Sequence, residues 1–391
     1  MQDVDVCIIG GGIQGCGVAQ AAAATGYRVV LLEQTALASA TSSRSSKLVH
    51  GGLRYLESGQ FALVAESLRE RELLVRNAPA LVKRMPFYIP VYKHTSRRPW
   101  QIRLGLSVYA LFGRLRATAC FKRLEREQWY ELGGLNTREL QVVYQYWDAQ
   151  TDDRELTRAL MYSACQLGAE LRCPAQFGGA QKGADGFTVD YTVNGTAHAL
   201  RCKALVNASG PWVKDVQARI RPSITLPPIE LVAGTHIVLD HPAPRGIFYV
   251  ESPSDRRAVF IMPWHGQTLI GTTEITYHGN PAQVEPTEHE VEYLCSIARN
   301  YFPGIRDTVV QQFAGLRVLP AAAHHAFARS RDTLYFTDPS LPGYVALVGG
   351  KLTTYRPAAH KALALLQANL PARTAQADTR QIRLTPAPDD F

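Results

Sequence analysis

The apolar and polar positions follow their most regular order in residues 1–33. Residues 4–9 form a short apolar run, which predicts a buried parallel strand, and three glycines follow it. An alanine-rich helix is predicted over residues 13–25, because Gly26 comes next as a helix-stop signal. Residues 28–32 form a second apolar run that ends at Glu33. The pattern therefore predicts a βαβ unit with a glycine turn.

The glycines of this turn have a spacing that favours a bound nucleotide. Gly10, Gly12 and Gly15 match G-x-G-x-x-G, in which the glycines allow the turn, the approach of a pyrophosphate and close helix packing. The phosphates would lie at the helix N-terminus, where N–H groups and the helix dipole favour anions. Glu33 is the expected ligand of an unphosphorylated ribose. FAD and NAD both fit, whereas a plain βαβ unit is the structural alternative.

The rest of the pattern alternates between helical and strand periodicity. Asn194-Gly195 separates the apolar runs 187–193 and 196–202 and predicts a hairpin with a type I′ turn. Short β-like runs between Pro and Gly turns fill residues 229–273. Helices are predicted over 61–76, 154–167 and 287–301, and strands over 203–206, 309–319, 334–336 and 344–348. We therefore expect an α/β protein, in which a Rossmann-like nucleotide domain is interleaved with a mixed β-sheet domain.

Composition narrows the class of protein. With 391 residues, 46% hydrophobic and 19% charged, the chain is long enough for two globular domains. It has no apolar run as long as a membrane span, and its first strand begins without a signal peptide, so we expect a cytoplasmic location. The seven cysteines include no C-x-x-C pair and no zinc spacing. No metal site or disulfide is predicted.

The net charge of +8 is concentrated in residues 93–126. This segment holds nine basic residues and one acidic residue, Glu125, together with Trp100, Tyr109 and Phe112. A cationic segment with aromatic residues suits an anionic membrane surface, so a peripheral position on the cytoplasmic face of a membrane is one prediction. A helix with a solvated basic face is the alternative. Nucleic acid is a weaker third interpretation, because no recognition motif accompanies the charge.

Two later segments favour FAD over NAD. The predicted strand that ends at Ala208-Ser209-Gly210 resembles the second flavin signature of FAD oxidoreductases. Residues 349–354 (GGKLTT) resemble their last signature, where a helix N-terminus lies under the flavin ring and its dipole stabilises the anionic reduced flavin.

Seven stretches, in order along nearly the whole chain, resemble the FAD-dependent, quinone-linked glycerol-3-phosphate dehydrogenases. They are IIGGGIQGCG (8–17), ATSSRSSKLVHGGLRYLE (40–57), DAQTDDREL (148–156), LVNASGPWV (205–213), IGTTE (270–274), AGLRVLP (314–320) and VGGKLTTYR (348–356). The resemblance implies a glutathione-reductase-like FAD domain and a β-sheet substrate domain. It also implies oxidation of sn-glycerol 3-phosphate to dihydroxyacetone phosphate, with ubiquinone as the electron acceptor.

The expected domain order alternates along the chain. The FAD domain takes segments 1–78, 148–225 and 331–370, and the substrate domain takes 79–147, which includes the basic segment, and 226–330. Residues 371–391 are polar, contain three prolines and are expected to form a loose tail.

Site residues follow from the matching motifs. Arg54 and Arg317 are candidate phosphate ligands, because guanidinium groups bind phosphate through two hydrogen bonds, although a structural ion pair is the alternative for each. His50 is the candidate base, since neutral imidazole is available near pH 7. Tyr55 and Thr273 could bind the substrate, and Lys351 could hold negative charge near the flavin. The implied FAD contacts are Gly10, Gly12, Ile13, Gly15, Glu33, Thr41, Ser42, Ser43, Ser46, Lys47, Leu48, Gly51, Gly52, Ala208, Ser209, Gly210, Gly350, Lys351, Leu352, Thr353 and Thr354.

The chain departs from this family in three places. It ends soon after the final flavin helix, where the family continues into a helical domain. Glu274 stands where an aspartate is common, and residues 321–331 are neutral to basic where the family often carries an acidic loop at the substrate entrance. Two alternatives therefore stay open, an FAD oxidoreductase of another small hydroxy or amino acid and a non-catalytic flavin-binding subunit.

Overall fold

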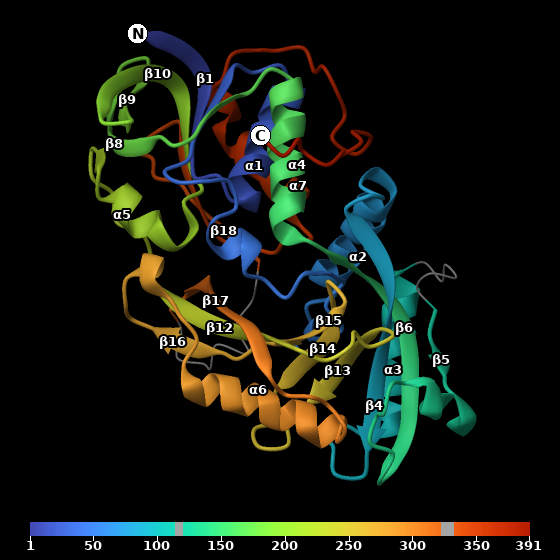
Figure 1. Ribbon diagram of the computed structural model, residues 1–391. Helices are drawn as coiled ribbons and strands as arrows, with labels where there is room; N and C mark the ends of the chain where they lie inside the picture. The colour runs from blue at the N-terminus through green and yellow to red at the C-terminus, as the bar shows by residue number, and fades with distance from the viewer. Residues whose placement is uncertain (114–119, 322–331) are drawn as a thin grey trace.

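The computed structural model describes residues 1–113, 120–321 and 332–391. Arg114, Arg116 and residues 322–331 of the predicted entrance loop thus lie outside the described residues. The described chain forms two sheets, each with its own helices, and Figure 1 shows one above the other.

The first sheet has nine described strands with the predicted βαβ unit at its centre. β10, β1, β2 and β7 are neighbours in parallel, β19 pairs in parallel with β10, and β8 and β9 extend the sheet on the other side. The strands are β1 (Gln2–Ile9), β2 (Val29–Leu32), β7 (Glu170–Arg172), β8 (Gln176–Gly183), β9 (Gly186–Val193), β10 (Thr196–Asn207), β11 (Ile220–Arg221), β18 (Thr333–Phe336) and β19 (Tyr344–Gly349). The predicted strand over 203–206 is therefore the end of β10, not a separate strand.

Three helices cover one face of this sheet. α1 packs against both α4 and α7, and the apolar side chains of all three meet those of β1, β2 and β19 in one core. The helices of the whole described chain are α1 (Ile13–Ala24), α2 (Phe61–Asn77), α3 (Pro99–Phe112), α4 (Asp153–Gln166), α5 (Val213–Gln217), α6 (Glu288–Tyr301) and α7 (Tyr355–Leu366). The predicted helices 13–25, 61–76, 154–167 and 287–301 are confirmed to within two residues at each end.

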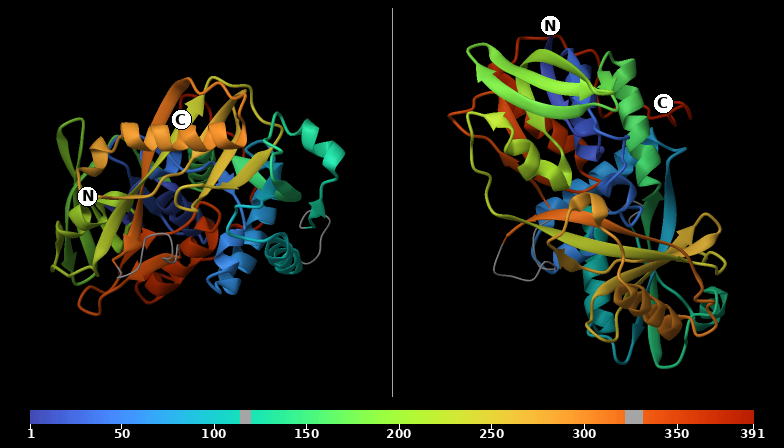
Figure 2. Two further views of the ribbon diagram at one scale, coloured as in Figure 1. Left: turned by 90° about the horizontal axis from the view of Figure 1, so that it is seen from below. Right: turned by 60° about the vertical axis from the view of Figure 1, so that its left-hand side comes forward.

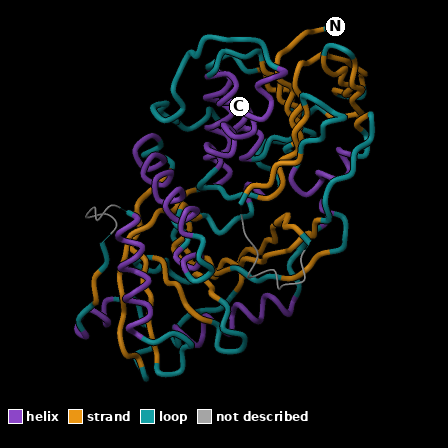
Figure 3. The backbone as a smooth tube through the Cα atoms, turned by 180° about the vertical axis from the view of Figure 1, so that it is seen from behind, coloured by secondary structure: helices purple, strands orange, loops and turns teal. Residues whose placement is uncertain are grey.

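The second sheet has ten described strands and carries helices on both faces. α6 closes one core, whereas α2 and α3 close the other, and the latter two helices lie next to each other in Figure 3. The strands are β3 (Leu48–Val49), β4 (Val82–Tyr92), β5 (Lys122–Arg123), β6 (Leu140–Thr151), β12 (Ile229–Leu239), β13 (Ile247–Glu251), β14 (Ala258–Trp264), β15 (Gln267–Gly271), β16 (Ile275–Tyr277) and β17 (Val309–Pro320). The mixed sheet predicted for the second domain is confirmed.

Local sequence signals explain several element ends. The Asp152 side chain accepts hydrogen bonds from the backbone N–H groups of Arg154 and Glu155 and so caps α4. Thr287 caps α6 in a capping box with Glu290. Asn194 and Gly195 have φ values of 49° and 79°, as the predicted type I′ turn requires.

The two sheets alternate along the chain, and the C-terminal segment returns to the first sheet. Both chain ends lie on that half of the molecule in Figure 1 and in the right-hand view of Figure 2. Residues 371–391 have no helix or strand, but they are packed rather than loose. The Gln376 N–H bonds the Ala24 carbonyl, Arg373 pairs with Asp5, and Leu384 is buried. The buried Leu384 side chain, which stands between polar residues in the sequence, thus helps to hold this segment on the domain. The exact domain boundaries stay predictions.

Candidate active site

A cavity of about 690 Å³ is lined by residues of both sheets. A pocket of this size between domains is typical of a small-molecule or cofactor site. Most of the predicted site residues line it: Gly10, Gly12, Ile13, Glu33, Thr41, Ser42, Ser46, Leu48, His50, Tyr55, Ala208, Ser209, Gly210, Arg317, Gly350, Lys351, Leu352 and Thr353. Residues that are more than 300 positions apart in the sequence thus converge on one cavity.

The glycine turn lines the cavity, and at Gly10 its backbone lies close to the end of β10. Gly10 has a φ of 109°, and a Cβ there would lie 2.6 Å from the Ala208 carbonyl oxygen. The Glu33 carboxylate accepts hydrogen bonds from the Gly11 N–H (2.7 Å) and the Thr35 N–H (2.9 Å), which fix it at the end of β2. The N-terminus of α1 opens into the same space. This cradle fits a dinucleotide pyrophosphate and its ribose.

The cavity lining also includes cationic and aromatic side chains. The Lys351 Nζ lies 3.7 Å from the centroid of the Tyr55 ring. Arg317, on β17, has its Nη1 3.4 Å from Oε1 of Glu274 and is 20% exposed. The His50 ring is tilted against Phe260, with 6.2 Å between centroids. The arrangement offers two cations and an imidazole to a small anionic substrate.

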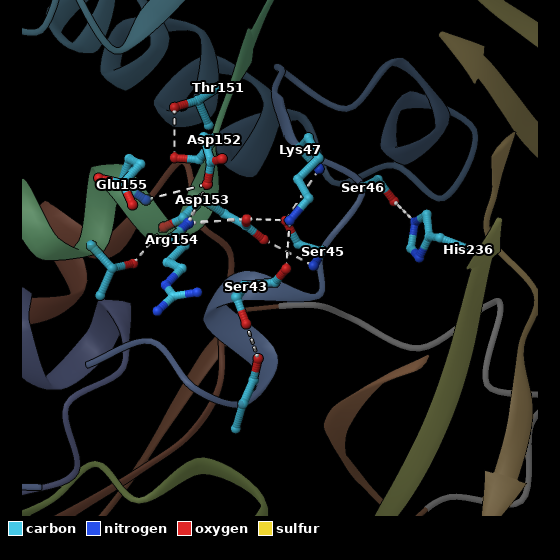
Figure 4. Close-up of polar contacts among 12 residues, drawn as sticks. Ser43, Ser45, Ser46, Lys47, Thr151, Asp152, Asp153, Arg154, Glu155 and His236 are labelled. Carbon is cyan, nitrogen blue, oxygen red and sulfur yellow. Dashed lines mark hydrogen bonds and ion pairs between the residues drawn. The ribbon is translucent and has the colours of Figure 1, made fainter. Parts of the chain in front are cut away.

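His236 is a cavity residue that the sequence analysis missed. It lies on β12, is 1% exposed, stacks on Phe313 and has its Nε2 3.0 Å from the Ser46 Oγ (Figure 4). Burial, and then the charges of Arg317 and Lys47, lower the pKa of His236 to about 3. The ring is therefore neutral at physiological pH and can serve as a hydrogen-bond partner for a ligand.

The lowered pKa of His236 predicts a contribution to stability that depends on pH. Between about pH 6.5 and pH 3, the unfolded chain binds a proton at this ring and the native chain does not, so the free energy of unfolding falls as the pH falls. We expect a contribution of about 1 kcal/mol per pH unit over pH 6 to 4.

In His236→Gln this part of the slope should disappear, without a change of slope above pH 7. Urea unfolding at several pH values measures both slopes, with His265→Gln as the control for an exposed histidine. Equal slopes for the wild type and His236→Gln over pH 6 to 4 would contradict the prediction.

The structure places Lys47 in a buried ion pair outside the cavity lining. Its Nζ lies 2.5 Å from Oδ1 of Asp153 and also donates to the Ser43 carbonyl, as Figure 4 shows. The Asp153 carboxylate accepts from the Ser45 N–H as well. The pair therefore ties the hydroxyl-rich loop to the start of α4.

Thr273 and Arg54 also lie outside the cavity lining. The buried Thr273 hydroxyl accepts a hydrogen bond from the Thr235 N–H and donates one to Glu290, so it links β12 to α6. The Arg54 guanidinium lies 5.7 Å from the centroid of the Tyr55 ring. Predicted FAD contacts that do not line the cavity are Gly15, Ser43, Lys47, Gly51, Gly52 and Thr354. Gly15 instead packs α1 on the turn, since a Cβ there would lie 1.9 Å from the Gly10 oxygen.

The described residues contain no group of three or more His, Cys, Asp or Glu side chains that could hold a metal ion. Among the same residues, no helix combines the length and the apolar character that crossing a bilayer requires.

Comparison with known proteins identifies the class that this fold and cavity define. Residues 5–356 match the family model described as FAD dependent oxidoreductase, and the chain belongs to this family. It is thus an oxidoreductase whose cofactor is FAD.

Its relatives narrow the class further. The chain is 34% identical over 374 residues to the aerobic glycerol-3-phosphate dehydrogenase of Escherichia coli, which covers 93% of this chain and 73% of the relative. It is 35% identical over 366 residues to the D-erythritol 1-phosphate dehydrogenase of Brucella abortus, and this match covers 92% of this chain and 72% of the relative. The structure is also similar to the solved glycerol-3-phosphate dehydrogenase of Bacillus halodurans complexed with FAD, with a TM-score of 0.77 and 28% sequence identity. This match covers 98% of this chain and 68% of the Bacillus halodurans chain. The resemblance stated from the motifs is confirmed.

Proposed function

We propose that this protein oxidises a small polyol phosphate at a secondary alcohol, and that sn-glycerol 3-phosphate is its substrate and dihydroxyacetone phosphate its product. The observation that carries the proposal is that Arg317, Lys351, His50 and His236 line the same cavity as the glycine turn. Two cations suit a dianionic phosphate, and the His50 imidazole suits a hydroxyl that must lose a proton. Several relatives of the chain are glycerol-3-phosphate dehydrogenases by name.

The cavity residues divide into cofactor and substrate contacts. FAD, when bound, accepts the hydride from the carbon that carries the hydroxyl. In this proposal the α1 N-terminus, Glu33 and the backbone of residues 208–210 hold its pyrophosphate and ribose, and the backbone of residues 350–353 lies near its ring. Arg317 binds the substrate phosphate, and Lys351, fixed over Tyr55, adds a second positive charge.

We assign the proton acceptor to His50. Its imidazole lines the cavity from the loop before Gly51. His236 Nε2 is already within hydrogen-bond distance of the Ser46 hydroxyl, so this neutral ring orients the substrate rather than taking its proton. The two rings therefore have different roles in the proposal. If His50 is the base, the rate of flavin reduction rises with pH as its imidazole loses a proton, and His50→Asn should remove this rise, whereas His236→Asn should retain it.

Anaerobic addition of substrate to the FAD-containing protein tests the reaction. We expect sn-glycerol 3-phosphate to bleach the flavin absorbance near 450 nm, as is general for flavin reduction. Glycerol and inorganic phosphate should leave the absorbance unchanged, because each lacks one half of the recognised group. A protein that holds FAD and is bleached by no polyol phosphate would contradict the proposal.

D-Erythritol 1-phosphate is the second candidate substrate. The specific observation is the Brucella abortus relative, which is as similar to this chain as the glycerol-3-phosphate dehydrogenases are. The two candidates share the phosphate and differ by one CHOH unit, so kcat/KM for both compounds, measured side by side, decides between them. A higher kcat/KM for the four-carbon substrate would replace the first candidate by the second.

We propose further that reduced FAD passes its electrons to a membrane quinone and that α3 docks the protein on an anionic bilayer. Trp100, Leu104 and Leu111 are 66%, 58% and 61% exposed. Spacings of four and seven residues place them in one stripe along the helix. Exposed basic residues stand just before and on the helix: Lys93, Arg98 and Arg103. An apolar stripe with a cationic border is typical of a helix that lies in the membrane interface.

Vesicle sedimentation tests this surface. The triple variant Trp100→Ala, Leu104→Ala, Leu111→Ala should bind vesicles containing phosphatidylglycerol at least about tenfold more weakly than the wild type, because it loses three insertable side chains. A matched control replaces three exposed apolar residues elsewhere, Ile275, Val310 and Leu365, by alanine. The docking proposal is wrong if both triple variants bind equally, or if vesicles of phosphatidylcholine alone bind the wild type as well.

A further inference from the structure

The loop that carries His50 and Tyr55 rests on a buried polar cluster that does not line the cavity. We call Arg71, Tyr109 and Asp148 the Tyr109 cluster; they lie on α2, α3 and β6, respectively. The side chains of Arg71 and Asp148 are 3% and 1% exposed, and Tyr109 is 1% exposed. Buried polar groups are retained where each of them is satisfied, so the contacts of this cluster indicate what it holds.

The contacts converge on one backbone N–H group. The Gly51 N–H donates to the Tyr109 hydroxyl at 2.8 Å, and the Tyr109 hydroxyl donates to Oδ2 of Asp148 at 2.7 Å. Asp148 Oδ1 accepts from Nη1 of Arg71 at 2.5 Å. The same Nη1 donates to the Trp147 carbonyl at 2.9 Å. The phenol both accepts and donates, and it therefore has to be neutral; burial raises its pKa well above the usual range.

The contact with Tyr109 requires a glycine at position 51. A Cβ at Gly51 would lie 2.5 Å from the Tyr109 hydroxyl and 2.6 Å from Leu68 Cδ2, so only glycine lets the loop come this close. The next residue, Gly52, has a φ of 77°, and the short helix over Leu53–Leu56 follows at once. The backbone is therefore held in place at Gly51, the residue that directly follows His50.

We propose that Tyr109 is a positioning residue that orients His50 through the Gly51 N–H, an inference that rests on the role of His50 in the proposed function. Asp148 and Arg71 hold the phenol in turn. Without the hydroxyl, the Gly51 N–H is buried with only its 3.4 Å contact to Asp148, which is too long for a strong hydrogen bond. The loop then opens more often, and the imidazole spends less time in its reactive orientation.

Tyr109→Phe removes the hydroxyl and leaves the ring in place. Tyr92→Phe is the matched control, since Tyr92 is 2% exposed and donates to the Asn136 carbonyl at 2.6 Å in another core. Deuterium exchange of the peptide over residues 48–56 should be at least about tenfold faster in Tyr109→Phe than in the wild type or in Tyr92→Phe. Unchanged exchange in this peptide overturns the proposal, whatever the substrate of the protein is.

The rate of anaerobic flavin reduction at saturating sn-glycerol 3-phosphate tests the link to His50. We expect Tyr109→Phe to lower it about tenfold, with Tyr92→Phe within twofold of the wild type. In a His50→Ala background, Tyr109→Phe should lower it less than twofold further, because the positioned group is gone. A full additional tenfold loss there would overturn the proposal. If the wild type itself is not reduced, the proposed function fails, and the exchange experiment still decides on the position of the loop.

Discussion

Replacing Arg317 by alanine is expected to lower kcat/KM for sn-glycerol 3-phosphate by about 10³-fold, or about 4 kcal/mol. Arg317 reaches the cavity from β17, and its guanidinium is four-fifths buried beside Glu274. A phosphate bound there accepts two hydrogen bonds from the planar guanidinium group, and the burial of this group reduces the screening of the charges by water. Stopped-flow reduction of the flavin at several substrate concentrations measures the loss.

Two further variants make this result specific to the phosphate contact. Arg317→Lys keeps the charge but not the fork, so about a tenfold to hundredfold loss is expected. Arg257→Ala is the matched control, because Arg257 donates to the Glu274 carbonyl at 2.9 Å and does not line the cavity. The assignment of Arg317 is wrong if Arg317→Ala keeps kcat/KM within tenfold of the wild type, or if Arg257→Ala falls as far.

The nucleotide-binding half could be predicted from the sequence because its signals are local. The apolar run before Gly10, the Gly10-Gly12-Gly15 spacing and the acidic residue after the second run are each readable within 33 positions. In the structure the same residues form β1, α1 and β2, and the Glu33 carboxylate accepts the Gly11 N–H. Each local preference agrees with the fold, so little tertiary information was needed.

The directions of several predicted site side chains depend on partners that are distant in the sequence. Lys47 was predicted to contact FAD, and its ammonium group pairs with Asp153, which follows 106 positions later. Thr273 was predicted to bind the substrate, and its hydroxyl donates a hydrogen bond to Glu290 on α6. Motif membership identifies a position near a site, whereas the direction of a side chain follows from what packs around it.

His236 shows which signal the sequence did contain. It stands in an apolar strand, where residues 232–239 are buried without a break. A single imidazole in such a run must find a polar partner or a cavity, since a buried polar group without either is costly. The residue could therefore have been proposed as a site residue, but its contacts with Ser46 and Phe313 could not, because these two residues come from other strands and loops.

Replacing Gly15 by alanine is expected to abolish stoichiometric FAD binding and to lower the free energy of unfolding by about 3 kcal/mol. A Cβ at this position would lie 1.9 Å from the Gly10 carbonyl oxygen, a backbone atom that no rotamer change can move. α1 must therefore lift from β1, which shifts its N-terminus away from the pyrophosphate position and breaks the contact of Gly10 with Ala208. The ratio of flavin to protein absorbance and thermal unfolding measure the two effects.

Gly105→Ala, in another helix, is the control for which we expect stabilisation and no loss of FAD. Gly105 lies in α3, where an added Cβ would come no closer than 4.0 Å to Leu53, and alanine should stabilise the protein by about 0.5–1 kcal/mol with its FAD content unchanged. The contrast separates the general preference of a helix for alanine from the steric demand at the glycine turn. Full FAD content in Gly15→Ala would show that α1 can retreat without loss of the site, and the cofactor contacts assigned to the turn would then have to be reassigned.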